Sequence, residues 1–348
     1  MAQEAERMTA LVKTDPSPGM SLDEVPVPEP GPGEVRLQVK SVGIDGGAEA
    51  LIYDWHPAKH HYEPHLPQIF GHEFAGVVDA VGPDVADAAV GDRVAVEPGI
   101  TCGRCRNCRA GEPSLCTGDS RRSIGLDVDV DGALAEYVTV PERTVYPFPD
   151  SLSYDEGTFL ELLGLGVHAV ELSDLEPGDR VAVSGPGSVG LSALIAADAA
   201  GAREAVMLGA EVDTGSRLPI AAEMGATETL NVEAESIEEE VDVFFEASGH
   251  ESALAEAVRA TRPGGQIVQI GIFHGEDAVP VDLNHLVRSG ITYETVYGRR
   301  DSSWRRAIAL ATETDLSPVV GPTFEMADYE RAFEAVRDRE GIKVTLHP

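Results

Sequence analysis

The sequence predicts an α/β protein of two domains, a β-rich, barrel-like domain followed by a doubly wound parallel sheet. Three observations carry this prediction. The chain is 348 residues long, its first part alternates apolar and polar residues between prolines and glycines, and its second part alternates short apolar runs with Ala- and Leu-rich stretches. A chain of this length can form a separate hydrophobic core in each domain. Strands that alternate with helices indicate βαβ units, which build parallel sheets.

In the first part, residues 35–42 and 76–81 have the alternation of half-buried strands, and residues 92–97 and 134–140 continue it. Four prolines mark a loop between strands: Pro26, Pro28, Pro30 and Pro32. The pattern favours antiparallel, barrel-like packing.

The pattern changes near residue 155. Four short apolar runs predict the strands of the parallel sheet: residues 181–183, 205–208, 241–245 and 266–270. Near the end of the chain, residues 331–337 are expected to form a helix and residues 341–346 a last strand.

All four cysteines fall in one short run: Cys102, Cys105, Cys108 and Cys116. Four thiolates at this spacing can close a tetrahedron around one ion, and zinc with four thiolates and no open position is a structural site. An iron–sulfur cluster is the alternative metal centre. Two disulfides are disfavoured, because such close spacings would strain them and the acidic start of the chain is no signal peptide. We predict a structural zinc lobe over residues 99–118, in a cytoplasmic protein.

A glycine-rich turn follows the apolar run 181–183 and opens a predicted helix over 191–200. It has the pattern G-x-G-x-x-G, with these candidate cofactor-binding residues: Gly185, Gly187, Ser188, Val189 and Gly190. This context predicts a dinucleotide pyrophosphate at a helix N-terminus, the alternative being a turn without a ligand. Glu211 follows the next strand, where an acid can bind the ribose 2′-hydroxyl, so NAD is favoured over NADP. The alternative for Glu211 is one more surface acid.

The formal net charge is −34, from 60 acidic and 26 basic residues. The acidic residues are spread along the chain, whereas a disordered acidic tail would concentrate them. Such a surface repels itself unless salt screens it, so we predict a high-salt cytoplasm. The charge also argues against nucleic acid and anionic membranes as partners, and no apolar stretch is long enough to span a membrane.

Residues 71–85 begin with Gly71-His72-Glu73 and continue with spaced glycines at 76 and 82. A neutral imidazole is a good zinc ligand, and Glu73 either holds that imidazole or binds the metal directly. A lone His-Glu pair is usually a surface pair, but the spaced glycines favour a catalytic metal site.

The cysteine run, the glycine-rich turn and residues 71–85 together resemble the zinc-dependent medium-chain alcohol dehydrogenases. The resemblance implies a GroES-like catalytic domain over residues 1–155 and 298–348, and a Rossmann domain over residues 156–297. It also implies a catalytic zinc besides the structural one, and homodimers or homotetramers joined through the dinucleotide domain.

The resemblance further implies the catalytic and metal-binding residues, which are Asp45, His72, Glu73 and Glu161. Asp45 stands where the family usually has a cysteine, as in the similar haloarchaeal glucose dehydrogenases, and this harder ligand should make the site less exclusive for zinc. Glu161 resembles the acid of the family's "E-P-L" helix, the alternative being an acid favoured by the helix dipole. Gly47 replaces the usual Ser or Thr proton relay, which leaves Glu49, Asp54, His56 or water for that role.

Residues 51–56, 67–72, 271–275 and 297–299 resemble L-threonine 3-dehydrogenases. We therefore expect an enzyme that transfers hydride from the secondary alcohol of a small polar substrate, threonine- or polyol-like, to NAD(P). One alternative is an aldose (glucose-type) 1-dehydrogenase of a halophile. The other is a catalytically silent nucleotide-binding homologue that holds structural zinc only.

Overall fold

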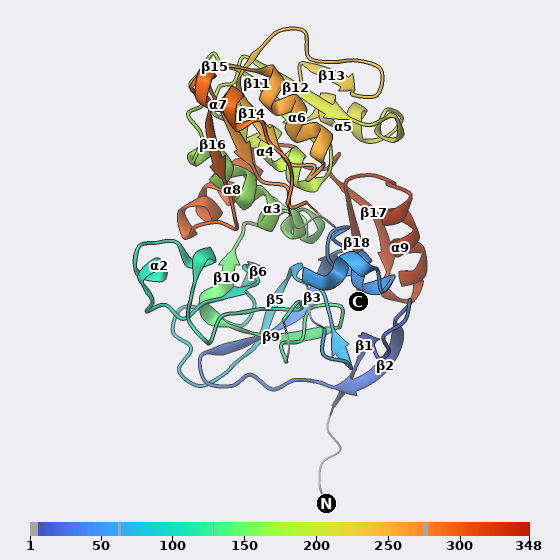
Figure 1. Cartoon of the computed structure of the whole chain (residues 1–348). Coiled ribbons are helices and arrows are strands. Elements are labelled where there is room, and N and C mark those ends of the chain that lie inside the picture. Colours follow the sequence, from blue (N-terminus) through green and yellow to red (C-terminus); the bar gives the residue numbers. More distant parts are fainter. Residues whose placement is uncertain (1–5, 62–63, 128, 274–277) are drawn as a thin grey trace, which may run out of the picture. The chain divides into compact units, whose positions relative to one another are not determined.

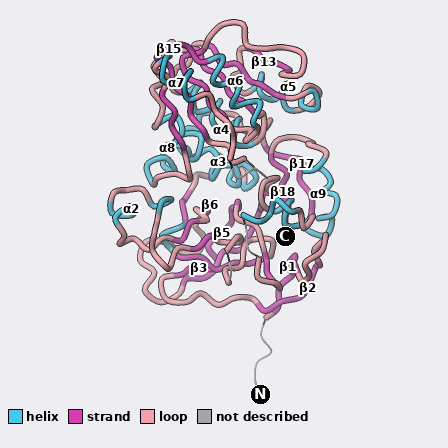
Figure 2. Tube along the Cα trace, in the orientation of Figure 1, coloured by secondary structure: helices cyan, strands magenta, loops and turns pink. Residues whose placement is uncertain are grey.

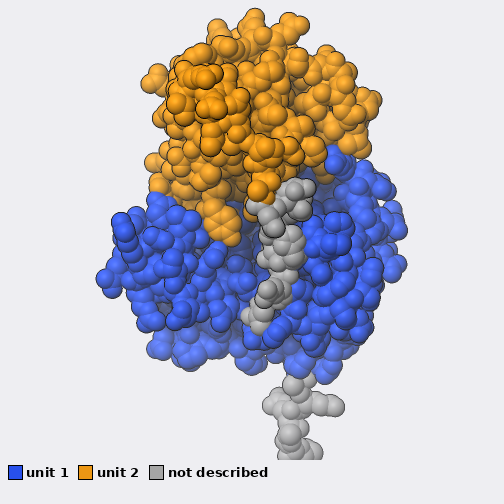
Figure 3. All heavy atoms as spheres, in the orientation of Figure 1, with its two compact units in different colours: residues 1–161, 320–348 blue, residues 162–319 orange. Residues whose placement is uncertain are grey.

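The computed structural model describes residues 6–61, 64–127, 129–273 and 278–348 (Figure 1). The chain forms two compact units, Met1–Glu161 with Val320–Pro348, and Leu162–Val319 (Figure 3). Helix α3 (Tyr154–Glu171) begins in the first unit and ends in the second.

The return of the chain to the first unit differs from the expected position at residue 298. It lies at Val320, because helix α8 (Asp301–Glu313) belongs to the second unit. There Ser303 Oγ donates a 2.8 Å hydrogen bond to the carboxylate of Glu171, and Trp304 is 1% exposed.

The first unit is built around a seven-stranded sheet. Strand β3 (Glu34–Gly43) pairs antiparallel with β5 (Glu73–Val81), and β18 (Lys343–His347) pairs antiparallel with the other edge of β3. The last strand of the chain therefore lies beside the strands that flank the candidate metal site. The remaining strands of this sheet are β6 (Arg93–Val96), β9 (Tyr137–Pro141), β10 (Val145–Pro147) and β17 (Val320–Glu325).

Strands and loops make up most of the first unit (Figure 2). Two smaller sheets complete it, one of β1 (Arg7–Lys13), β2 (Ser21–Pro26) and β4 (Gln68–Ile69), the other of β7 (Gly99–Ile100) and β8 (Arg122–Ser123). Its other helices are α1 (Glu49–Tyr53), α2 (Arg106–Arg109) and α9 (Tyr329–Arg337). Among the described residues, short 3₁₀ turns lie at Pro57–His61, Pro113–Leu115, Glu142–Thr144, Glu211–Asp213 and Met326–Asp328.

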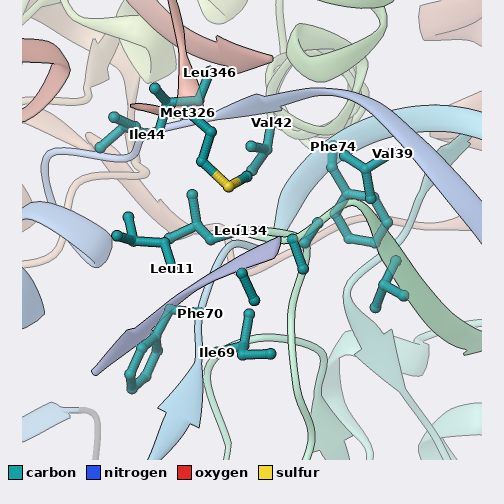
Figure 4. Packing of buried hydrophobic residues seen from close by; sticks show 14 of the residues in the cluster. Leu11, Val39, Val42, Ile44, Ile69, Phe70, Phe74, Leu134, Met326 and Leu346 are labelled. Atoms are coloured by element: carbon teal, nitrogen blue, oxygen red, sulfur yellow. The ribbon is translucent and has the colours of Figure 1, made fainter. Parts of the chain in front are cut away.

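Buried hydrophobic residues from the strands, the connecting loops and helix α9 form the core of the first unit (Figure 4). Along β3, Val35, Leu37 and Val39 are buried, whereas the residues between them are partly exposed. This period of two is what the sequence pattern predicts for a half-buried strand. Burial of each such aliphatic side chain contributes about 1.5–3 kcal/mol to the stability of the folded state, relative to leaving the side chain exposed.

The second unit is a six-stranded parallel sheet with the order β13-β12-β11-β14-β15-β16. In chain order this is 3-2-1-4-5-6, the order of dinucleotide-binding sheets, and it confirms the predicted doubly wound fold. The strands are β11 (Arg180–Ser184), β12 (Glu204–Gly209), β13 (Glu228–Asn231), β14 (Val241–Glu246), β15 (Thr261–Gln269) and β16 (Thr292–Thr295). The other helices are α4 (Ser188–Ala199), α5 (Arg217–Glu223), α6 (Glu251–Ala260) and α7 (Leu283–Ser289). Within the described ranges, none of the helices combines the length and apolar character needed to cross a membrane.

Candidate active site

His72 and Glu49 form a buried pair at the candidate metal site. His72 Nδ1 lies 2.6 Å from Oε1 of Glu49, and the backbone N–H of His72 donates to the same oxygen at 3.2 Å. Glu49 is fully buried and His72 is 8% exposed. Because the contact with Glu49 occupies Nδ1, it orients the ring so that Nε2 is the nitrogen available to a metal.

The backbone before His72 requires glycine. Gly71 has φ +101°, and a Cβ there would lie 2.9 Å from the backbone nitrogen of Leu134. This turn delivers His72 to the start of β5, and β5 pairs with β3 so that Glu73 faces Gly43. Strand pairing therefore brings His72 to Asp45, which lies just beyond the end of β3.

Asp45, Glu49 and His72 form a cluster in which one potential ligand atom of each lies within 4.8 Å of the others. The backbone N–H of Asp45 also donates to Oε2 of Glu49 at 3.2 Å. Carboxylate and imidazole groups are ligands for zinc, so the donor set fits a divalent cation. The sequence placed Glu49 only among the proton-relay candidates. In the sequence, the one indication of its contact with His72 is that Glu49 is an acid four residues after Asp45, a predicted ligand.

Glu73 forms an ion pair with Lys343, and both side chains are 1% exposed. Burial lowers the pKa of Lys343 to about 8, against the opposing effect of the charges on Asp45 and Glu49. Glu73 is thus beside the three-residue cluster and faces a cation. Sequence reasoning missed Lys343, because only the pairing of the last strand with β3 brings it to the site.

Glu161 lies on α3 in the first unit and is 6% exposed. It is not a member of the three-residue cluster, but its charge contributes to raising the pKa of His72. The structure thus places Asp45 and His72 together with Glu49, and Glu161 within electrostatic range of them.

The pKa of His72 is raised from 6.5 to about 9 in the metal-free protein. Burial, the largest single effect, would lower this pKa. The charge and hydrogen bond of Glu49, together with the charges of Glu161 and Asp45, outweigh burial. At neutral pH the metal-free imidazole is therefore protonated, and a metal has to displace the proton on Nε2.

We accordingly expect divalent-metal binding at pH 7 to release about one proton more from the wild type than from His72→Ala, because ligands bind in deprotonated form. Since the pKa is about 9, the difference should vanish above that pH. Calorimetric titration in buffers of different ionisation enthalpy measures it, and the comparison with His72→Ala cancels protons released by the cysteines. Equal proton release from the two proteins at pH 7 would contradict the prediction.

The four cysteines form a second cluster, with sulfur atoms within 4.8 Å of one another. Backbone N–H groups donate to these sulfurs, for example Cys105 to Cys102 at 3.3 Å and Gly118 to Cys116 at 3.4 Å. Such donors, from Cys108 and Thr117, lower the pKa of the Cys105 thiol to about 5, which favours the thiolate that zinc binds. The Cys102 and Cys108 sulfurs are 3.9 Å apart, far beyond a disulfide bond, so the set fits one tetrahedral ion.

The glycine-rich turn has the geometry of a dinucleotide loop. Gly185 has φ +88°, and a Cβ on Gly190 would lie 1.9 Å from the carbonyl oxygen of Gly185. Gly187 precedes α4, which Ser188 and Val189 open, and a Cβ on Gly187 would meet nothing within 4 Å. The helix N-terminus is therefore open to an anionic group such as a pyrophosphate, which the residues present fit.

Glu211 is exposed just beyond the carboxyl end of β12, the neighbour of β11. Its carboxylate accepts a hydrogen bond from the side-chain amide of Asn231, and its backbone N–H donates to Glu233 at 3.1 Å. This is the position from which an acid reaches the adenosine ribose in dinucleotide-binding folds.

Comparison with known proteins agrees with this geometry. The family model for the alcohol dehydrogenase GroES-like domain matches residues 31–150, and that for zinc-binding dehydrogenases matches residues 188–313. An L-threonine 3-dehydrogenase from Anaeromyxobacter sp. is 35% identical, over 97% of this chain and 99% of that protein.

Solved structures give the same result. The 2R,3R-butanediol dehydrogenase from Bacillus subtilis is 27% identical with a TM-score of 0.85, over 98% of this chain and 99% of that one. A protein from Sinorhizobium meliloti described as a zinc-binding dehydrogenase, solved with NADP bound, is 27% identical with a TM-score of 0.87, over 99% and 100% of the two chains. The chain therefore belongs to the zinc-dependent medium-chain alcohol dehydrogenases, oxidoreductases that act on a small-molecule alcohol with a nicotinamide cofactor.

Proposed function

We propose that this protein oxidises the secondary hydroxyl of a small polar, threonine- or polyol-like substrate, with NAD favoured over NADP. The observation that carries the proposal is the buried Glu49–His72 pair beside Asp45. It combines an oriented imidazole with carboxylates in a family whose relatives include L-threonine 3-dehydrogenases and a butanediol dehydrogenase.

We assign Asp45, His72 and Glu161 as ligands of the catalytic zinc, and Glu73 as the partner of Lys343. These side chains would hold a zinc ion, whose Lewis acidity would lower the pKa of the substrate hydroxyl. Glu49 fixes the imidazole through Nδ1, and the ammonium of Lys343 offsets part of the negative charge of the site. We assign the structural zinc to the four-cysteine cluster of Cys102, Cys105, Cys108 and Cys116, whose sulfur atoms lie close enough together to hold one ion.

Gly47 has no hydroxyl group, so another group has to relay the proton that the substrate releases. Two of the candidates from sequence are already engaged: Glu49 holds His72, and Asp54 forms a 2.8 Å ion pair with Arg337. His56 is exposed, and its Nδ1 accepts a hydrogen bond from the backbone of Ala58 at 3.1 Å. We therefore assign the relay to His56 or to water.

The experiment that tests this function is initial-rate formation of NADH or NADPH by zinc-loaded protein in molar KCl. L-Threonine, polyols and aldoses are compared side by side, each with NAD and NADP. Turnover of threonine or a polyol with preference for NAD supports the proposal. Turnover of aldoses alone would establish the glucose-type alternative. No turnover in a protein that binds one zinc ion per chain would favour the silent homologue. The comparisons favour neither alternative.

NAD preference follows from Glu211, whose carboxylate would repel the 2′-phosphate of NADP. The variant Glu211→Ala tests this preference. We expect it to lower the ratio of kcat/KM with NAD to kcat/KM with NADP. An unchanged ratio would remove Glu211 from cofactor selection.

Self-association through the second unit is proposed as well. Strand β16 is an edge of the six-stranded sheet. This strand and α7, which precedes it in the chain, carry exposed apolar side chains: Leu283, Val287 and Tyr293. An edge strand with apolar neighbours is a template for pairing between copies. Light scattering after size-exclusion chromatography should show a dimer or tetramer.

We also propose a high-salt cytoplasm as the setting, from the net charge of −34. The apparent Tm should fall steadily as KCl is lowered from about 3 M to about 0.1 M, because the Debye length grows from about 3 Å at 1 M to about 10 Å at 0.1 M. Scanning calorimetry of the zinc-loaded protein with and without added zinc and NAD separates charge repulsion from loss of ligands. Full stability in millimolar salt without either ligand would refute this setting.

A further inference from the structure

Glu246 is a fully buried carboxylate at the point where the strand order of the parallel sheet reverses. The chain runs outward from β11 to β13 and then, in the other direction, from β14 to β16. Ser184 and Glu246 are the paired last residues of the two central strands, β11 and β14. Ligands of open α/β sheets bind outside the carboxyl ends of the strands at this point, so we expect the cofactor to bind beyond the strand ends that carry Ser184 and Glu246.

Glu246 accepts hydrogen bonds from several neutral donors. Its Oε1 accepts from Ser184 Oγ at 3.1 Å, from the backbone N–H of Ser248 at 2.8 Å and from the Ser248 hydroxyl. The backbone N–H of Gly249 is shared between Oε1 at 3.1 Å and Oε2 at 3.2 Å, and Oε2 also accepts from the amide of Gln269. The backbone and amide N–H groups among these partners can only donate, and none of the partners carries a positive charge that would neutralise a carboxylate.

These contacts join the last residues of β11 and β15 to the loop that follows β14. A Cβ on Gly271 would lie 2.3 Å from the backbone nitrogen of Gly249 and 2.9 Å from Oε2 of Glu246, so the packing is tight. Tyr293 donates a 2.9 Å hydrogen bond to Oε1 of Gln269 and thereby orients its amide toward Glu246. Burial, and after it the charge of Glu246, raises the pKa of Tyr293, so the carboxylate acts electrostatically beyond its hydrogen-bonding partners.

We propose that the buried charge of Glu246 makes the protein bind NAD⁺ more tightly, relative to NADH, than it would without that charge. The oxidised nicotinamide ring carries one positive charge that the reduced ring lacks, so a fixed negative charge nearby stabilises the oxidised form selectively. Burial protects this interaction from the salt that screens the acidic surface. The arrangement favours uptake of NAD⁺ and release of NADH, which suits an enzyme that oxidises alcohols. This inference rests on the proposed use of NAD.

The test is equilibrium binding of NAD⁺, NADH and ADP-ribose to the zinc-loaded protein and to Glu246→Gln, followed by calorimetry or protein fluorescence. Glutamine keeps the shape and removes the charge. We expect the ratio of the Kd for NAD⁺ to the Kd for NADH to rise about threefold to tenfold, as expected for one charge at intermediate distance in a partly screened interior. The Kd for ADP-ribose, which lacks the nicotinamide ring, should change no more than the Kd for NADH does.

Ser184→Ala is the matched control, because it removes one hydrogen bond to Glu246 and leaves the charge. It should weaken NAD⁺ and NADH binding by the same factor, so the ratio stays at the wild-type value. If Glu246→Gln fails to fold, Gln269→Lys places an ammonium beside Oε2 and should shift the ratio in the same direction.

Equal weakening of NAD⁺ and NADH in Glu246→Gln would overturn the inference and leave the proposed function intact, since Glu246 would then act only through structure. A wild type that binds none of the three ligands, nor NADP⁺, would overturn both.

Discussion

Replacing His72 with alanine is expected to lower kcat/KM at least about a thousandfold, because it removes the nitrogen that we propose as a ligand of the zinc that would activate the substrate hydroxyl. The same change should reduce the zinc content from two ions per chain to one, since the four-cysteine cluster is separate from the Asp45–Glu49–His72 cluster. Steady-state kinetics combined with metal analysis of the purified protein checks both parts.

Two variants make this prediction specific. Glu49→Gln keeps a hydrogen-bond acceptor for Nδ1 but removes the charge, and loss of such a supporting partner costs about 10- to 100-fold in metal affinity or activity. His285→Ala alters an exposed histidine of the second unit and should leave both rate and zinc content unchanged. Activity of His72→Ala near that of the wild type would reject the proposed metal site.

The features that sequence predicts well are those encoded locally. The strands of the parallel sheet are buried on both faces, so they read as uninterrupted apolar runs such as Val181–Val183, and β11 forms there. The four cysteines lie within one short run, and their spacing alone predicts a cluster. The glycine-rich turn is equally local, because Gly185 and Gly190 are needed for the backbone geometry of the turn itself.

Features that depend on distant contacts were missed. Nothing near Lys343 in the sequence points to Glu73, and only the pairing of β18 with β3 brings them together. Glu246 ends an apolar strand, and the sequence pattern suggests the first polar residue of a loop, although the residue is fully buried. The unit boundary lies at Val320 because α8 packs near Glu171 in the second unit. The amphipathic pattern of a helix does not predict which of two cores the helix packs against.

Breaking the buried Glu73–Lys343 pair should have a large effect on stability. Lys343→Met is expected to lower the free energy of unfolding of the first unit by about 3–5 kcal/mol, because it leaves the carboxylate of Glu73 buried without a cation. The double variant Glu73→Gln with Lys343→Met removes both charges and should recover most of the loss. Lys40→Met, on the half-buried side of β3, is the matched single change and should cost less than about 1 kcal/mol.

The same variants decide what Glu73 does toward a metal. In the wild type, Lys343 forms an ion pair with Glu73. Lys343 also lies close to Asp45 and Glu49, whose charges act against the lowering of its pKa by burial. Without this ammonium, Glu73 can turn toward the cluster, and the repulsion of a divalent cation disappears. Zinc should therefore stabilise Lys343→Met by more than it stabilises the wild type, as measured by denaturant unfolding at fixed KCl across a zinc titration. If zinc stabilises both proteins equally, Glu73 contributes nothing to metal binding even when released, and its function is to hold the C-terminal strand against the site.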